Sequence, residues 1–307
     1  MTSEKSLLRG IGLMTLGITV FVLMSAFVKE AARIPAGEAM FFRAAGALPV
    51  VLVWLAMRGD LPGGIATRNV RSHAVRGIAG SLAMALGFAG LRFLPLPEVT
   101  AIRFVTPVLI VLLAALILGE RIRLVRISAV VLGLVGTAVI TAPRLSGGFG
   151  SREAVGALMI LGSAGLAALA QVFVKAMSGR EKTAAIVFWF QLTAAALALC
   201  SWPFGWVMPH GWEWLWLAGA GITGGLGQIL VTASYRHAEA GVLAPFTYVS
   251  MLWSLLIGYL WFGETATWPM MMGAGLIIAS GAIIVARERQ LGLRANAERK
   301  IAAKSMH

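Results

Sequence analysis

Two arginines interrupt long apolar stretches, and their chemistry gives the first indication of what this chain could bind. Arg43 lies within the apolar segment 36–57, and Arg103 lies within the apolar segment 98–118. A charge inside such a segment is energetically costly and usually functional. Because a guanidinium can donate two parallel hydrogen bonds to a carboxylate, the two arginines predict a binding site for an anionic or zwitterionic small molecule.

Each arginine also has a structural explanation, which the sequence leaves open. Arg43 could neutralise Glu38, and Arg103 could neutralise Glu98, because each pair lies near the same boundary of its segment. A long cationic side chain can also extend along apolar surface toward the lipid head groups.

Further polar and aromatic side chains within the apolar segments could complete such a site. Thr106 follows Arg103 at a spacing of three, which places both on one face of a continuous helix. Amide and aromatic groups could hold a zwitterion and a flat side chain, although each of them could equally serve helix packing. The predicted substrate-binding residues are Arg43, Arg103, Thr106, Trp189, Gln191, Gln228, Tyr248 and Trp253.

Two prolines and two Gly-Glu pairs mark positions where helices could bend or end. Pro107 and Pro245 each remove one helical hydrogen bond, so each can kink a helix, free a carbonyl group or form a gate. Glu120 and Glu264 each follow a glycine at the end of an apolar run, where the glycine allows a left-handed helix terminus. We therefore expect these four residues to be structural or gating residues.

The composition requires a lipid environment for the elements that carry these residues. Hydrophobic residues make up 59% of the 307 residues, and only 13% are charged. A soluble domain of this size cannot bury so much apolar surface. Since unpaired backbone groups are costly in lipid, the crossings must be helices of about 20 residues. The predicted spans are 8–28, 36–57, 72–93, 98–118, 125–142, 154–177, 182–202, 213–235, 240–262 and 268–286.

The basic residues predict the orientation of these spans. Most of the 26 Lys and Arg residues fall on the side of the N-terminus, which places both termini in the cytoplasm by the positive-inside rule. The net charge of +13 is thereby explained and gives no reason to expect nucleic-acid binding. The basic tail either lies against anionic lipid head groups or has no specific role. We expect a multi-pass protein of the bacterial inner membrane.

The sequence also contains an internal duplication. A shift of 144 positions places Gly80 on Gly224 and Glu120 on Glu264. Each copy holds five apolar stretches, and an odd number of crossings inverts the second copy relative to the first. The fold class predicted is therefore an all-α polytopic membrane protein, with ten transmembrane helices in two inverted five-helix repeats. The expected parts are the repeats 1–142 and 154–286, the linker 143–153 and the tail 287–307.

An apolar run ending in Gly-Glu closes the fourth span of both halves, at residues 107–120 and 255–264. With the duplicated five-helix unit, this motif resembles the ten-helix EamA-type branch of the drug/metabolite transporter superfamily, over residues 8–286. The resemblance implies a secondary transporter that moves small organic metabolites by alternating access, with export of an amino acid or related metabolite as the expected activity. The pattern is incomplete in the second copy, where Met251 stands at the position of Pro107.

Other functions remain open to the sequence. Uptake of a vitamin or nucleoside-like metabolite, drug efflux and a channel are alternatives. An intramembrane enzyme would need clustered acid/base groups or metal ligands at membrane depth, and the sequence has no His-Glu-x-x-His or paired-Asp motif. All 13 acidic residues lie near span ends or in loops, so facilitated diffusion or exchange is as compatible as proton antiport. We expect no cofactor, no metal and a functional monomer.

Overall fold

The computed structural model describes residues 4–67, 69–118, 124–145, 151–177, 181–234, 249–280 and 282–283, with residues 237, 243, 246 and 247. Throughout these residues the long elements are α-helices. They are α1 (Glu4–Glu30), α2 (Ala36–Met57), α3 (Val70–Gly90), α4 (Leu96–Arg103), α5 (Val105–Leu118), α6 (Leu124–Leu145), α7 (Arg152–Met177), α8 (Thr183–Leu199), α9 (Glu213–Ser234), α11 (Val249–Phe262) and the helix Trp268–Ser280, with a short 3₁₀ helix at Trp202–Phe204.

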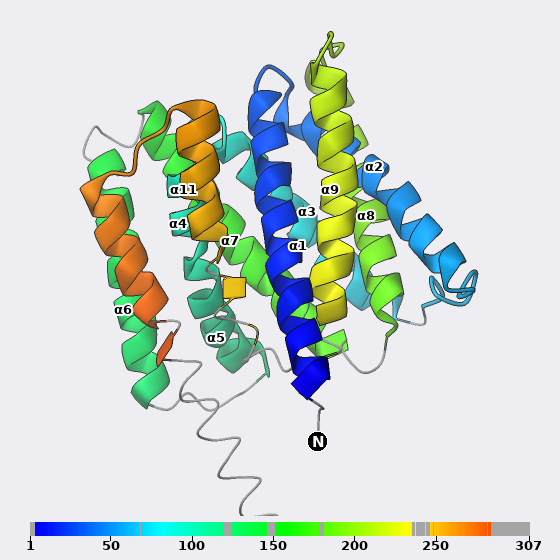
Figure 1. The fold of residues 1–307 in the computed structure, drawn as a ribbon, viewed down its shortest axis with the longest axis horizontal. Helices are drawn as coiled ribbons and strands as arrows, with labels where there is room; N and C mark the ends of the chain where they lie inside the picture. The colour runs from blue at the N-terminus through cyan, green and yellow to red at the C-terminus, as the bar shows by residue number, and fades with distance from the viewer. Residues whose placement is uncertain are drawn as a thin grey trace, which may run out of the picture.

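The helices give the ten predicted crossings, because α4 and α5 together form one broken crossing. Figure 1 shows that α1 and α7 run in opposite directions, as do α2 and α8. Corresponding helices of the two halves are therefore inverted, as an odd number of crossings per repeat requires.

The predicted fourth span, 98–118, is not the continuous helix that the sequence indicated. The chain leaves the α-helix at Phe104, whose N–H donates to the carbonyl three residues earlier at 3.1 Å. Pro107 has no N–H, so the carbonyl of Arg103 has no partner four residues ahead, and the helix breaks there. Consequently Arg103 ends α4 while Thr106 belongs to α5, and the two do not share one helical face.

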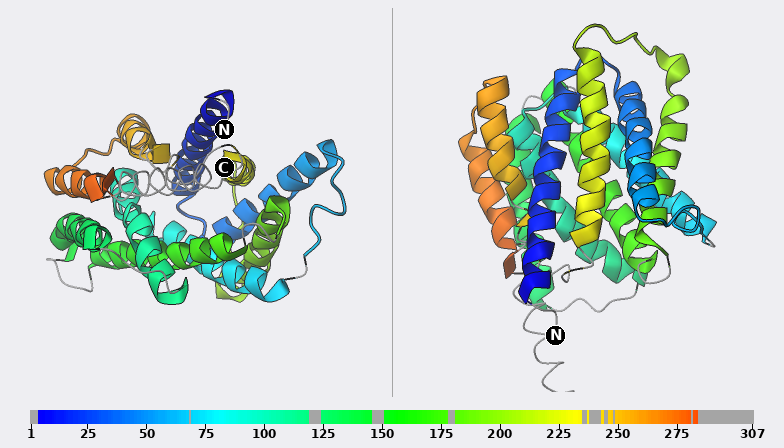
Figure 2. Two further views of the ribbon diagram at one scale, coloured as in Figure 1. Left: turned by 90° about the horizontal axis from the view of Figure 1, so that it is seen from below. Right: turned by 45° about the vertical axis from the view of Figure 1, so that its right-hand side comes forward.

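Helices of one half pack against helices of the other. The first helix of each half lies against the third helix of the opposite half, so α1 packs on α9 and α7 packs on α3. Figures 1 and 2 show α1 and α9 side by side. Glycines lie at both contacts, with Gly219 of α9 beside Phe27 of α1 and Gly90 of α3 beside Ile160 of α7. Small residues allow membrane helices to approach closely.

Close contacts at glycines repeat between the two halves. A methyl group added at Gly224 in α9 would lie 2.7 Å from Nε of Arg43 in α2. A methyl group added at Gly80 in α3 would lie 2.8 Å from the ring of Phe190 in α8. The two glycines are equivalent under the shift of 144, so Arg43 and Phe190 occupy equivalent positions of the two halves.

A second set of contacts has the same relation. Gly221 in α9 approaches the backbone of Gly46 in α2, while Gly77 in α3 approaches the side chain of Thr193 in α8. Under the same shift Gly77 corresponds to Gly221, and a shift of 147 places Gly46 on Thr193, as it places Arg43 on Phe190. The duplication is therefore present in the packing between helices as well as in the sequence.

Large apolar side chains cover the outside of the bundle. Leu116 is 79% exposed and Trp268 is 82% exposed, and both belong to apolar helices. In the part of the chain that the structure describes, four helices are long and apolar enough to cross a membrane by themselves. They contain the segments Leu8–Glu30, Ala36–Met57, Arg152–Val174 and Glu213–Ser234.

Candidate functional site

A cavity of about 150 Å³ lies where α1, α4 and the start of α11 meet. Because α1 and α4 belong to the first half and α11 to the second, the cavity lies between the repeats. Its walls combine apolar and aromatic groups with three hydroxyl groups and one guanidinium. The lining residues are Ile18, Phe21, Val22, Ser25, Leu96, Thr100, Arg103, Phe104 and Ser250.

Arg103 supplies the positive charge in the described lining of this cavity. The sequence predicted it as a substrate-binding residue, and its contact with a substrate stays a prediction. It is the last residue of α4, so the break at Phe104 sets its position. Its guanidinium also reaches α3, where it occupies the space beside Gly87 that a methyl group would fill. The hydroxyl of Ser163 in α7 borders the same space and donates to the carbonyl of Ala83 at 2.6 Å.

The three hydroxyl groups in the cavity lining could form hydrogen bonds with a ligand. Those of Ser25 and Thr100 donate to backbone carbonyls of their own helices, at 3.1 and 3.0 Å. Each hydroxyl oxygen keeps accepting capacity in that arrangement. Ser250 similarly donates to the carbonyl of Thr247 at 2.7 Å. Together with Arg103, they can hold a ligand that carries an anionic group beside a donor.

Arg43 lies in a different cluster, between α2, α8 and α9. Its Nη1 donates to Oε1 of Gln191 at 2.5 Å, and its guanidinium is 5.8 Å from the ring centroid of Phe190. The sequence suggested Glu38 as an alternative partner, but the Glu38 carboxylate accepts the N–H of Val207 at 2.9 Å. Arg43 and Gln191, both predicted binding residues, therefore contact each other.

The structure places the remaining predicted binding residues elsewhere. The indole of Trp189 donates to the carbonyl of Ile65 at 2.9 Å, in the segment between α2 and α3. Trp253 packs against the main apolar core. The described lining of the cavity includes neither Thr106 nor Gln228, and Tyr248 lies outside the residues that the structure describes.

Among the predicted gating residues, Glu264 joins three elements at one end of the bundle. Gly263 has φ +63°, and its N–H donates to the carbonyl of Tyr259, which is the left-handed helix terminus expected there. The Glu264 carboxylate then forms an ion pair with Lys29 of α1 and accepts the N–H of Leu96 at 2.8 Å. Glu120 and Pro245 lie outside the described residues.

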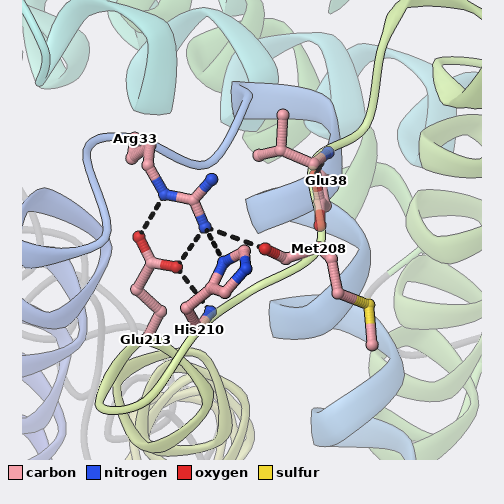
Figure 3. A network of polar contacts seen from close by, with 6 residues as sticks. Arg33, Glu38, Met208, His210 and Glu213 are labelled. Carbon is pink, nitrogen blue, oxygen red and sulfur yellow. Dashed lines mark hydrogen bonds and ion pairs between the residues drawn. The ribbon is translucent and has the colours of Figure 1, made fainter.

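A second polar network closes the same end of the bundle. Figure 3 shows Arg33, which follows α1, directed at the Glu213 carboxylate. Its Nε and Nη2 atoms donate to the two carboxylate oxygens at 2.8 and 2.5 Å. Arg33 also donates to the carbonyl of Met208 at 2.8 Å and contacts Nδ1 of His210 at 2.9 Å. The hydrogen bond to Glu213 raises the pKa of Arg33 above its ordinary value, so Arg33 stays charged.

Polar pairs also join the two halves at the opposite end. Lys182, before α8, contacts Asp60, after α2, at 2.8 Å. Nε2 of His73 in α3 lies 3.4 Å from a carboxylate oxygen of Glu181. Both ends of the bundle are thus held by polar contacts between a segment of the first half and a segment of the second.

Sequence reasoning missed Arg76 and, apart from Glu264, the residues of these end contacts. Arg76 was not among the predicted binding residues, but it is only 8% exposed and its guanidinium carbon lies 3.9 Å from the ring centroid of Phe190. Arg76 lies six residues from the start of α3, and this position inside a span was the signal that could have indicated its burial. Nothing in the sequence paired Lys29 with Glu264, since 235 positions separate them.

The duplication agrees with a known family. The EamA-like transporter family matches this chain twice, over residues 8–142 and 154–286. The chain belongs to this family. It is therefore a multi-pass membrane transporter, as the resemblance of its Gly-Glu motifs implied.

Individual relatives extend the comparison to nearly the full chain. The pseudopaline exporter CntI of Pseudomonas aeruginosa is 30% identical over 286 residues, which cover 92% of this chain and 97% of that protein. The riboflavin transporter of Vibrio cholerae is 26% identical over 83% of this chain and 84% of its own length. A solved crystal structure with 23% identity has the same fold, with a TM-score of 0.65 over 91% of this chain and 98% of its own.

Proposed function

We propose that this EamA-family protein exports a small anionic or zwitterionic metabolite, such as an amino acid or a related compound, by alternating access. The observation that carries the proposal is the cavity between the repeats, in which Arg103 is accompanied by the hydroxyls of Ser25, Thr100 and Ser250. A guanidinium recognises a carboxylate by paired hydrogen bonds, and hydroxyls suit the amino or hydroxyl groups of the same molecule. The name of the pseudopaline exporter supports export.

The cavity volume supports a site that encloses only part of a substrate. A volume of about 150 Å³ corresponds to roughly five water molecules at ~30 Å³ each. Pockets for drug-sized ligands usually measure ~300–1,000 Å³. The cavity can therefore hold a carboxylate and its neighbouring atoms, and a larger metabolite requires the two halves to separate further.

The end contacts support the alternating part of the mechanism. Opening one end requires separation of Lys29 from Glu264 and of Arg33 from Glu213. Opening the other end requires separation of the pairs formed by Asp60 with Lys182 and by His73 with Glu181. Rocking of one repeat against the other would break one set while the other set holds.

The organisation of the chain in the membrane is part of this proposal. Residues 1–142 and 154–286 act as the two repeats, 143–153 link them, and the tail 287–307 lies in the cytoplasm with the N-terminus. The excess of basic residues on that side supports this orientation in a bacterial inner membrane. One copy of the chain supplies both repeats, so a monomer suffices for transport.

A second candidate substrate is a flat heteroaromatic metabolite. Phe21 and Phe104 line the same cavity as Arg103 and could stack on a ring system. Two relatives are named riboflavin transporters, which supports testing this class as well. Uptake, the direction opposite to export, then becomes the activity to measure.

The test begins with purified protein and a panel of amino acids, other carboxylates and flavins. A compound that binds the native state raises its melting temperature by mass action. We expect the best compound to show saturable counterflow in proteoliposomes, and we expect Arg103→Ala to lose both effects. Arg92→Ala, which removes an exposed arginine between α3 and α4, is the matched control. Unchanged stabilisation of Arg103→Ala would remove Arg103 from the site.

A further inference from the structure

Two buried arginines from different helices converge on one aromatic ring, away from the cavity between the repeats. The ring of Phe190 in α8 has Arg76 of α3 at 3.9 Å and Arg43 of α2 at 5.8 Å from its centroid. Arg43 is 3% exposed and Arg76 is 8% exposed, and Gln191 beside them is fully buried. None of these residues belongs to the described lining of the Arg103 cavity.

The cluster contains hydrogen-bond donors that the described protein groups do not satisfy. Four of its buried nitrogen atoms have no hydrogen-bond partner: Nε of Arg43, Nε and Nη1 of Arg76, and Nε2 of Gln191. The Oε1 atom of Gln191 is already occupied by Nη1 of Arg43, so the amide nitrogen is the group that remains free. All four atoms are donors, and an unsatisfied buried donor is costly. The missing partner must be an acceptor.

The charge of the cluster indicates that this acceptor is an anion. Among the ion pairs of the described residues, none joins Arg43 or Arg76 to a carboxylate. The Glu38 carboxylate, which lies on the same helix as Arg43, instead accepts the N–H of Val207 at 2.9 Å. Two guanidinium groups held close together repel each other, and a neutral water molecule would not compensate that repulsion.

The ring of Phe190 offsets only part of this cost. A cation over an aromatic face is stabilised by the ring, and more so when the cation is desolvated. A guanidinium that lies over a ring directs its N–H groups along its own plane, and the ring does not satisfy them. The two unpaired nitrogens of Arg76 are consistent with that arrangement.

The cluster lies deep in the membrane. Arg43 is seven residues from the start of α2, and Arg76 is six residues from the start of α3, which begins at the opposite end of the bundle. At 1.5 Å per residue, each is about 10 Å from its own end. Gly224 leaves the space that the Arg43 side chain occupies, because a methyl group there would lie 2.7 Å from Nε. A buried cation pair at this depth needs a specific counter-ion.

We propose that Arg43, Arg76, Phe190 and Gln191 form a buried anion-binding site, which takes one small monovalent anion. Chloride and a carboxylate group share the chemistry that these donors recognise. This site is distinct from the Arg103 cavity, and its existence does not depend on the transported metabolite. Its occupation joins α2 and α3 of the first half to α8 of the second half, so the bound anion stabilises the contact between the repeats.

The test uses the full-length protein in detergent, in a halide-free buffer in which sodium methanesulfonate keeps the ionic strength constant. Sodium chloride or sodium formate then replaces the methanesulfonate stepwise, and the melting temperature is recorded. We expect a saturable rise for the wild type with at least one of these anions. We expect no rise for Arg76→Gln and a wild-type rise for Arg58→Gln, which removes an arginine at the exposed end of α2.

The two sources of the anion give different results. A rise with formate alone assigns the site to a carboxylate, and a rise with chloride, alone or with formate, assigns it to an inorganic anion. No saturable rise with either anion in the wild type would overturn the proposal, as would an identical rise in Arg76→Gln. If Arg76→Gln does not fold, crystals of the wild type decide the matter, soaked in bromide where chloride gave the rise and in formate where formate alone gave it. An anomalous peak for bromide, or formate density, is expected beside Arg43 and Arg76, and its absence contradicts the site. The formate titrations are repeated in an Arg103→Ala background, so that a carboxylate bound in the cavity between the repeats does not contribute. None of these measurements requires transport, so they succeed or fail independently of the proposed export activity.

Discussion

The substitution Gly87→Ala tests the role of Arg103 without removing the arginine. The added methyl group would occupy the space that Nη2 of Arg103 fills, so the guanidinium must move from its position against α3. Because the displaced atom is the end of a flexible side chain, we expect little loss of stability. Alanine is also favoured over glycine in a helix by about 0.5–1 kcal/mol.

The effect on binding should be much larger than the effect on stability. Hydrogen bonds to charged groups contribute about 1.5–3 kcal/mol, and about 1.4 kcal/mol corresponds to a tenfold change in affinity. Misplacing Arg103 should therefore weaken binding of the stabilising metabolite by about 10- to 100-fold. Isothermal titration of the purified protein measures this change directly.

The control for this experiment is Gly165→Ala in α7, where an added methyl group meets no atom within 4 Å. It should bind the metabolite as the wild type does. The reasoning is refuted if Gly87→Ala binds with wild-type affinity while its melting temperature is unchanged, because the guanidinium would then not have contributed to the site.

Three further predictions concern an end contact, the broken helix and the orientation in the membrane. Glu264→Gln should lower the melting temperature by a few degrees and speed substrate counterflow, because it removes the ion pair with Lys29. The charge swap Lys29→Glu with Glu264→Lys should reverse part of both effects, as thermal unfolding and counterflow measure. Pro107→Ala returns an N–H that can donate to the carbonyl of Arg103, so it should raise the melting temperature while slowing counterflow; faster transport would contradict the importance of the break. A reporter fused after Arg287 should respond as cytoplasmic, and a periplasmic signal would overturn the assigned orientation.

The sequence was sufficient to predict the architecture, because its signals are local or periodic. The apolar runs predicted ten crossings, and the equivalence of Gly80 with Gly224 predicted the duplication that the contacts to Phe190 and Arg43 confirm. The position of Pro107 predicted a distortion, although not that it would divide the span in two. These features depend on the chemistry of one segment at a time.

The site was only partly predictable, because it depends on which side chains meet across helices. The sequence identified Arg103, but not its place beside Gly87 or the two serines and the threonine that share its cavity. It did not identify Arg76, which the structure buries beside Phe190. The tilt and rotation of a helix decide whether a residue near its end faces lipid, water or another helix, and those quantities are set by packing rather than by the segment itself.

The most direct measurement of alternating access is the accessibility of the cavity from each side of the membrane. Thr100→Cys, in a background with Cys200→Ser, places the one thiol of the chain in the lining between the repeats. A membrane-impermeant maleimide should label it both in right-side-out and in inside-out vesicles, and the stabilising metabolite should slow labelling from both sides. Labelling from one side alone, with metabolite present or absent, would contradict a cavity that opens alternately to the two aqueous phases.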